Sequence, residues 1–96
     1  MKPSLALRAH RDELRCIVAR HGVRAPRIFG SVVSGLDGED SDLDLLVEPD
    51  TSTTLFTLAA LQDEAEQLLG VRVDVLTPKA LPRRLRDGVL ASAVPL

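Results

Sequence analysis

Asp42 and Asp44 stand at the start of the apolar run Leu45-Leu46-Val47. In a β-strand, residues i and i+2 point to the same face, so these two carboxylates would lie side by side, about 7 Å apart at the backbone. Adjacent anions repel, and a protein relieves the repulsion by protonation, by an Arg or Lys partner, or by a divalent metal ion. Mg²⁺ is usually held by one or two carboxylates plus substrate phosphates, so the pair is a candidate metal site.

A third acid, Asp74, interrupts another apolar segment, residues 71–76. Polar and apolar residues alternate there, which predicts a strand with its valines on one face and Asp74 on the other, together with Arg72. If this strand lies beside that of Asp42 and Asp44, three carboxylates converge on one end of a sheet. Such a cluster suits two-metal phosphoryl or nucleotidyl transfer.

A glycine-containing segment precedes the acids. Gly30-Ser31 follows a short apolar run, and Gly35 comes four residues after Ser31. Glycine lets the backbone approach an anion closely, while N–H groups and the Ser31 hydroxyl can donate to it. A Gly-Ser turn alone is more often only a turn, but followed by the three acids in this order it predicts a metal and nucleotide site.

The elements that must position these residues alternate along the chain. The helix boundaries are indicated by candidate N-caps, at Ser4 and at Ser52 or Thr53, and by glycines at the helix ends. The spacing of apolar residues separates helices from strands. We expect helices over residues 4–21 and from 54 to 69, a short helix beginning near 82, and strands over 27–29, 43–48 and 71–76, with a loop between the first two strands. This alternation predicts one domain, residues 1–96, of the α/β or α+β class.

Composition excludes several classes of protein. The net charge of −2 and the scattered basic residues argue against a nucleic-acid binder. No apolar run approaches the roughly 20 residues that span a bilayer, and no signal peptide begins the chain, so we expect a cytoplasmic protein without a membrane association. The single cysteine, Cys16, cannot form an internal disulfide and is expected to be half-buried.

As a set, these motifs resemble the minimal nucleotidyltransferase family, small members of the DNA polymerase β superfamily. The resemblance rests on Gly30-Ser31, Gly35, the segment Ser41-Asp42-Leu43-Asp44-Leu45-Leu46-Val47, and Val73-Asp74-Val75-Leu76. It implies a small mixed sheet flanked by helices, with ATP as the nucleotide donor and Mg²⁺ as cofactor. It also implies that Asp42, Asp44 and Asp74 are catalytic metal ligands and that Gly30, Ser31 and Gly35 hold the nucleotide, together with Asp42 and Asp44.

The resemblance further implies a partner. Many members are antitoxins of HEPN-domain ribonuclease toxins, and characterised members transfer AMP to a tyrosine of the toxin. By similarity, a HEPN-domain toxin would be the protein substrate, and we expect a homodimer or a hetero-oligomer with that toxin. An enzyme acting on a small molecule such as an aminoglycoside is less favoured, because no second domain is expected to hold the acceptor.

One departure from the family pattern leaves two functions open. The family loop commonly reads Gly-Ser-Arg-Ala-Arg-Gly, whereas Val32 and Ser34 occupy the two arginine positions here. The chain could be an active enzyme in which Arg72 or Lys79 replaces the lost cations, or a degenerate antitoxin that neutralises its toxin by binding alone. A haloacid-dehalogenase-like phosphatase, suggested by Asp42 and Asp44 alone, is not expected, because that fold needs a longer chain after these residues, with a later lysine and acid pair.

Other charged residues receive simpler interpretations. The acidic loop that holds Asp37, Glu39 and Asp40 is expected to be a solvated surface segment. The arginines at 83, 84 and 86 are expected to form a solvated helix face or part of a partner surface.

Overall fold

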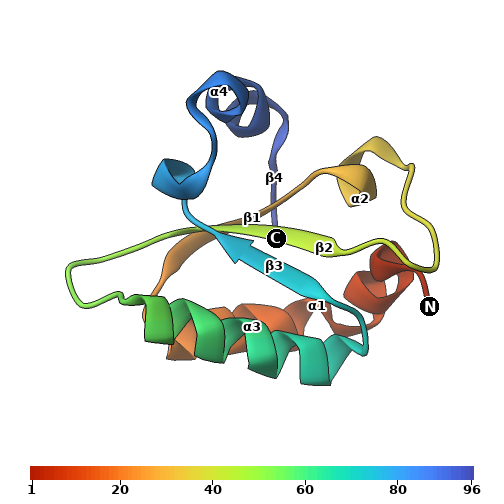
Figure 1. Cartoon of the computed structure of the whole chain (residues 1–96). Coiled ribbons are helices and arrows are strands. Elements are labelled where there is room, and N and C mark those ends of the chain that lie inside the picture. Colours follow the sequence, from red (N-terminus) through yellow and green to blue (C-terminus); the bar gives the residue numbers. More distant parts are fainter.

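Two long helices cover one face of a sheet in the computed structural model, which describes all 96 residues (Figure 1). Helix α1 spans Pro3–Arg20 and has proline at its first position, where a missing N–H costs no hydrogen bond. Helix α3 spans Leu55–Leu69 and begins with a capping box between Thr54 and Thr57. No helix is both long and apolar enough to cross a membrane.

The sheet is mixed, with the strand order β3-β2-β1-β4. Its strands are β1 (Arg24–Phe29), β2 (Leu43–Glu48), β3 (Val73–Leu76) and the two-residue β4 (Val94–Pro95). Strand β1 is antiparallel to β2 and to β4, whereas β2 and β3 are parallel and joined through α3. The predicted small mixed sheet flanked by helices is therefore confirmed.

The main core lies between the sheet and the two long helices. Leu43, Leu45 and Val47 of β2 are fully buried in it, and Val73 and Val75 of β3 are also buried there. The valines of β3 thus share one face, as the alternation predicts. Because side chains alternate along a strand, the intervening residues of β2 and β3 must point to the opposite face, which α1 and α3 do not cover.

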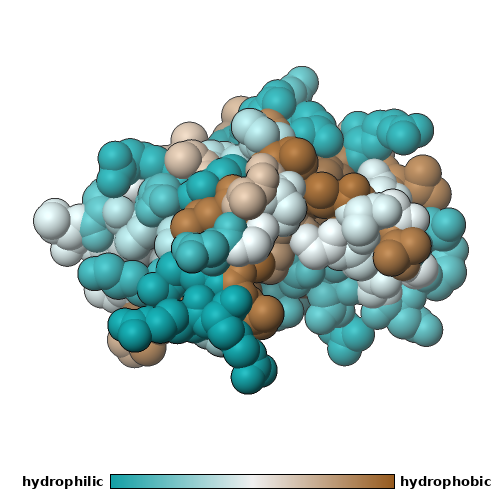
Figure 2. Space-filling model, turned by 90° about the horizontal axis from the view of Figure 1, so that it is seen from above, coloured by the Kyte–Doolittle hydropathy of each residue, from teal (hydrophilic) through white to brown (hydrophobic).

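The opposite face is covered only in part. Helix α4 (Arg83–Ser92), the short 3₁₀ helix η1 (Pro78–Ala80) and the four-residue helix α2 (Ser31–Ser34) stand on it (Figure 1). Beneath them, Phe29, Leu46 and Leu81 form a second, smaller apolar cluster. Figure 2 views this face from above, where apolar side chains gather between hydrophilic ones.

Arg86 fastens α4 to the chain before it, which corrects its interpretation as a solvated or partner-facing residue. Its Nε donates to the Pro78 carbonyl at 2.8 Å, and its guanidinium also donates to the carbonyl of Leu81 at 3.2 Å. Both acceptors lie around the 3₁₀ helix, so Arg86 fixes the position of α4 above the sheet.

The N-terminus of α1 is capped from a distant loop. Ser4 does not act as the cap; its backbone N–H instead donates to Asp37 Oδ2 at 2.9 Å. Asp37 is correspondingly buried, which corrects the expectation of a fully solvated acidic loop. Hydrogen bonds from Ser4 hold the pKa of Asp37 below its ordinary value. The loop between α2 and β2 is therefore tied to the first helix.

Three further differences have local causes. Strand β1 begins earlier than predicted and tolerates Pro26 because its pairing with β2 shifts between Arg24 and Arg27. The loop after β1 contains the helical turn α2. Cys16 is exposed, because it lies on the side of α1 opposite the buried residues, although its sequence neighbour Ile17 is buried.

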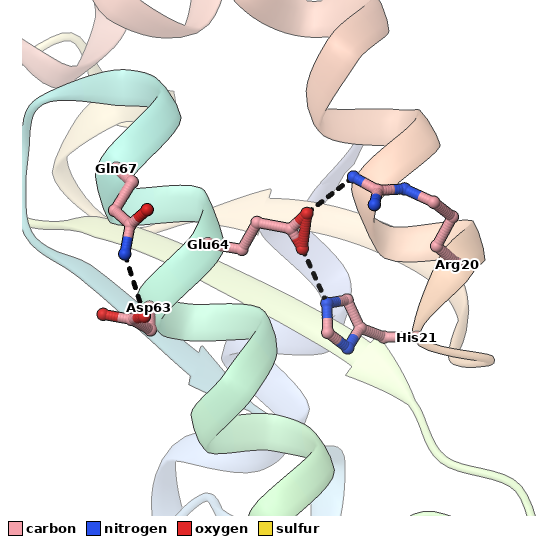
Figure 3. A network of polar contacts seen from close by, with 5 residues as sticks. All are labelled: Arg20, His21, Asp63, Glu64 and Gln67. Atoms are coloured by element: carbon pink, nitrogen blue, oxygen red, sulfur yellow. Dashed lines mark hydrogen bonds and ion pairs between the residues drawn. The ribbon is translucent and has the colours of Figure 1, made fainter.

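A network of polar side chains links α1 and α3 on the face of the sheet that these two helices cover (Figure 3). Glu64 of α3 accepts from Arg20 at 2.6 Å and pairs with His21 Nε2 at 3.0 Å. The hydrogen bond from His21, followed by that from Arg20, lowers the pKa of Glu64. His21 thus joins α1 to α3, and it lies away from the candidate site.

Candidate active site

Asp44 and Asp74 lie directly opposite each other on neighbouring strands. The parallel register of β2 and β3 pairs Leu43 with Val73 and Asp44 with Asp74. Leu43 and Val73 are buried beneath the sheet, so both aspartates point to the partly open face. Adjacent strands are about 4.8 Å apart, which brings the two carboxylates together. The strand of Asp74 therefore lies beside that of Asp44, as the expected meeting of these two acids requires.

The proximity of these acids changes the protonation of Asp44. Its pKa is raised to about 6, first by burial, then by the negative charge of Asp74 and then by that of Asp42. Three like charges in one region are costly without a counter-charge. The site therefore favours either a proton or a cation near Asp44.

Asp42 is only partly neutralised. Arg72 Nε lies 2.9 Å from Asp42 Oδ1 as an ion pair, yet this oxygen is buried and has no partner in hydrogen-bonding geometry. Arg72 also donates to the Asp40 carbonyl at 3.2 Å and has a largely exposed side chain. A buried carboxylate oxygen without a hydrogen bond is an acceptor available for a ligand.

The donor set fits a metal ion that also binds a substrate. No group of three or more His, Cys, Asp and Glu side chains forms a ready cage in the protein. Mg²⁺ is commonly held without such a cage, by one or two carboxylates with water and substrate phosphates completing its coordination. The repulsion around Asp44 is a feature that a bound cation would relieve, and Asp42 Oδ1, which is ion-paired with Arg72 but accepts no hydrogen bond, has acceptor capacity left.

Gly30 lies against the acids. Gly30 lies beside Asp44 because the residue before it, Phe29, is the cross-strand partner of Asp44. A Cβ atom on Gly30 would overlap Asp44 Oδ2, and the residue has φ +78°, a conformation that favours glycine. Gly30 also begins α2, where its carbonyl accepts from Val33 and Ser34 N–H groups at 3.1 and 3.2 Å. Glycine is therefore required here for both space and backbone conformation.

Helix α2 directs no cation toward this site. Val32 and Val33 pack against the main core, and the exposed Ser34 donates its hydroxyl to the Ser31 carbonyl at 3.2 Å. Ser31 itself is half-buried. Gly35 ends the turn in the left-handed conformation, at φ +78°, and a Cβ atom at this position would meet nothing within 4 Å.

A cavity of about 600 Å³ opens beside Gly30, between α2 and α4. Nine residues line it: Phe29, Gly30, Val33, Ser34, Arg84, Leu85, Gly88, Val89 and Ser92. Ligand sites typically measure about 300 to 1,000 Å³. The cavity is thus large enough for a small molecule, and one of its lining residues, Gly30, lies against Asp44.

The contribution of α4 to this cavity was not predicted from the sequence. Arg84, Gly88 and Ser92 recur every four residues, which places them on one side of a helix. This spacing was the feature of the sequence that could have indicated a shared surface on α4. Of the two cations expected as substitutes, Arg72 lies beside the acids and Lys79 does not. Arg72 pairs with Asp42, and Lys79 lines a separate hollow with Glu48.

The chain matches the nucleotidyltransferase domain family over residues 9–95. It belongs to this family. A protein adenylyltransferase, MntA, from Thermococcus cleftensis is 40% identical over 88 residues, covering 92% of this chain and 86% of the relative. The predicted family and the class of enzyme, a nucleotidyltransferase, are therefore confirmed.

Solved structures agree with this assignment. A protein assigned as a minimal nucleotidyltransferase is 47% identical and superimposes with a TM-score of 0.86, covering 97% of this chain and 95% of the other. A chain from the crystal structure of a toxin–antitoxin with AMP-PNP has the same fold, with a TM-score of 0.75 at 16% identity. That alignment covers 88% of this chain and 69% of the other.

Proposed function

We propose that this chain is a Mg²⁺-dependent protein adenylyltransferase that transfers AMP from ATP to a tyrosine hydroxyl of a HEPN-domain toxin and so acts as its antitoxin. The observation that carries the proposal is the in-register pair Asp44 and Asp74, with Gly30 against Asp44 and Asp42 close enough for its charge to raise the pKa of Asp44. Relatives named protein adenylyltransferases and the nucleotide analogue in a toxin–antitoxin crystal of the same fold support it.

Each residue has a distinct part in this proposal. Asp42, Asp44 and Asp74 would hold Mg²⁺, which when bound neutralises phosphate charge and favours ionisation of the acceptor hydroxyl. Gly30 leaves room for the Asp44 carboxylate to lie against the backbone, and the Ser31 hydroxyl can donate to phosphates. With a pKa of about 6, Asp44 is ionised at neutral pH and ready to accept a cation.

The acceptor would reach the site from the partly open face. Two large apolar side chains of α4 remain exposed there, Leu85 at 50% and Leu90 at 36%. Exposed apolar residues beside a reaction site are suited to contact with a protein partner. The proposed toxin would thus place its tyrosine beside the carboxylates while resting on α4.

Labelled ATP tests the proposal directly. The protein is incubated with Mg²⁺, ATP labelled in the adenosine and the product of the neighbouring gene, and label on the partner is measured. Wild type and Asp63→Asn, which changes an exposed carboxylate of α3 on the opposite side of the sheet, should label the partner equally. Asp42→Asn and Asp44→Asn should lose labelling by about a hundredfold or more. Equal labelling by all four proteins would refute the assigned role of the acids.

A non-catalytic antitoxin is the second candidate, favoured by the composition of α2. Val32 packs into the core and Ser34 bonds within its own turn, so neither replaces a phosphate-binding arginine. In this case Asp44→Asn would protect cells from the toxin as well as wild type does. Loss of protection with retained toxin binding would instead favour the enzyme.

A further inference from the structure

The cavity beside Gly30 has two walls with different chemistry. The wall formed by β1 and α2 contains no charged side chain among its lining residues, Phe29, Gly30, Val33 and Ser34. Its one side-chain hydroxyl, that of Ser34, already donates to a backbone carbonyl. A triphosphate next to Gly30 would therefore obtain no cation from this wall.

The facing wall, formed by α4, contains one cation. Arg84 is the only charged side chain that lines the cavity, and it makes no hydrogen bond or ion pair with the protein. Its neighbours in α4 differ. Arg83 is also exposed but does not line the cavity, and the guanidinium of Arg86 is held by the carbonyls around the 3₁₀ helix.

One position of α4 that lines the cavity has no side chain. Gly88 follows Arg84 by one helical turn and lines the cavity, and a Cβ atom there would meet nothing within 4 Å. Glycine inside a helix destabilises it relative to alanine, and neither close packing nor a positive φ requires glycine here. Fold stability therefore does not explain the glycine at position 88, whereas the open cavity beside Arg84 does.

We infer that α4 supplies the phosphate-binding cation that α2 lacks: Arg84 contacts the phosphates of the nucleotide, and Gly88 leaves room for that nucleotide between the two helices. This inference rests on the proposed function, because it takes ATP as the ligand. Arg84 is suited to the task, since a guanidinium presents several donors to phosphate oxygens and stays charged at all relevant pH values.

Calorimetry on the isolated protein with Mg²⁺ tests the inference without catalysis. ATP, inorganic tripolyphosphate and adenosine are titrated into wild type, Arg84→Ala, Arg84→Lys and the matched control Arg83→Ala. Arg84→Ala should weaken ATP and tripolyphosphate binding about tenfold and leave adenosine binding unchanged, because one charge-assisted contact to phosphate is lost. Arg84→Lys should recover part of the loss, and Arg83→Ala should match wild type.

Gly88→Leu separates cavity space from fold stability. It should weaken ATP binding while leaving the urea midpoint equal to or above that of wild type, because leucine favours a helix more than glycine does. ATP binding to Arg84→Ala or to Gly88→Leu within about twofold of wild type would overturn the inference and leave the proposed function standing. Failure of wild type itself to bind ATP with Mg²⁺ would overturn both.

Discussion

Replacing Asp44 by asparagine should stabilise the fold at neutral pH while removing activity. The folded protein raises the pKa of this carboxyl from 3.8 to about 6, through burial first and then through repulsion by Asp74 and Asp42. The folded state therefore holds the proton more tightly than the unfolded state does. Ionised Asp44 is a destabilising group, and asparagine removes its charge with little change in shape.

The expected size follows from the shift. A change of about two pKa units corresponds to about 3 kcal/mol at about 1.4 kcal/mol per unit. Asp44 is only about half-buried, so solvent screening reduces this figure, and we expect about 1 to 2 kcal/mol. The size of the difference depends on pH: wild type has its full stability below about pH 4 and loses this amount as pH rises through about 6.

Urea unfolding in EDTA at several pH values between 4 and 8 measures the effect. The free energy of unfolding of Asp44→Asn should exceed that of wild type by about 1 to 2 kcal/mol at pH 7.5, and the two should converge near pH 4. Asp87→Asn, which changes an exposed carboxylate without a partner, should follow wild type at every pH. If Asp44→Asn is less stable than wild type at pH 7.5, repulsion among the acids is not the dominant effect.

Three further results are expected. Gly30→Ala should abolish nucleotidyl transfer and destabilise the protein, because the added methyl group would overlap the Asp44 carboxylate. Gly35→Ala should lower the free energy of unfolding by only about 1 kcal/mol, from its positive φ, because no atom lies within 4 Å of the added Cβ. Urea unfolding of both variants measures the difference. Asp37→Ala should increase hydrogen exchange in the first turn of α1, which loses its capping acceptor, and unchanged exchange would contradict that role. Cys16 should react with a thiol reagent in the native protein as fast as in urea, and protection from the reagent would contradict its exposed position.

Much of the fold could be predicted because local patterns agree with long-range structure. The alternation in β3 indicated which side of the sheet Asp74 faces, and the caps and leucine spacing of α3 indicated the helix between β2 and β3. That these two strands are parallel neighbours was a condition of the predicted cluster, and the register shows it. Under that condition, the two patterns allowed the meeting of Asp44 and Asp74 to be anticipated from strands separated by a whole helix.

Other features depend on contacts that no local pattern encodes. Asp37 is buried because it reaches the backbone of Ser4, 33 residues away in the chain. The arginines of α4 have similar surroundings in the sequence, yet Arg86 binds backbone carbonyls while Arg84 lines the cavity. The distinction arises only when α4 packs over the sheet.

Binding of Mn²⁺, a paramagnetic substitute for Mg²⁺, in the presence of a non-hydrolysable ATP analogue tests the central claim most directly. Electron paramagnetic resonance should show metal bound to wild type and to Asp87→Asn at the same affinity. Asp74→Asn should weaken that binding by about tenfold or more, because it removes a carboxylate supplied by the second strand. Equal Mn²⁺ affinity in wild type and Asp74→Asn would show that the paired strands do not form one metal and nucleotide site.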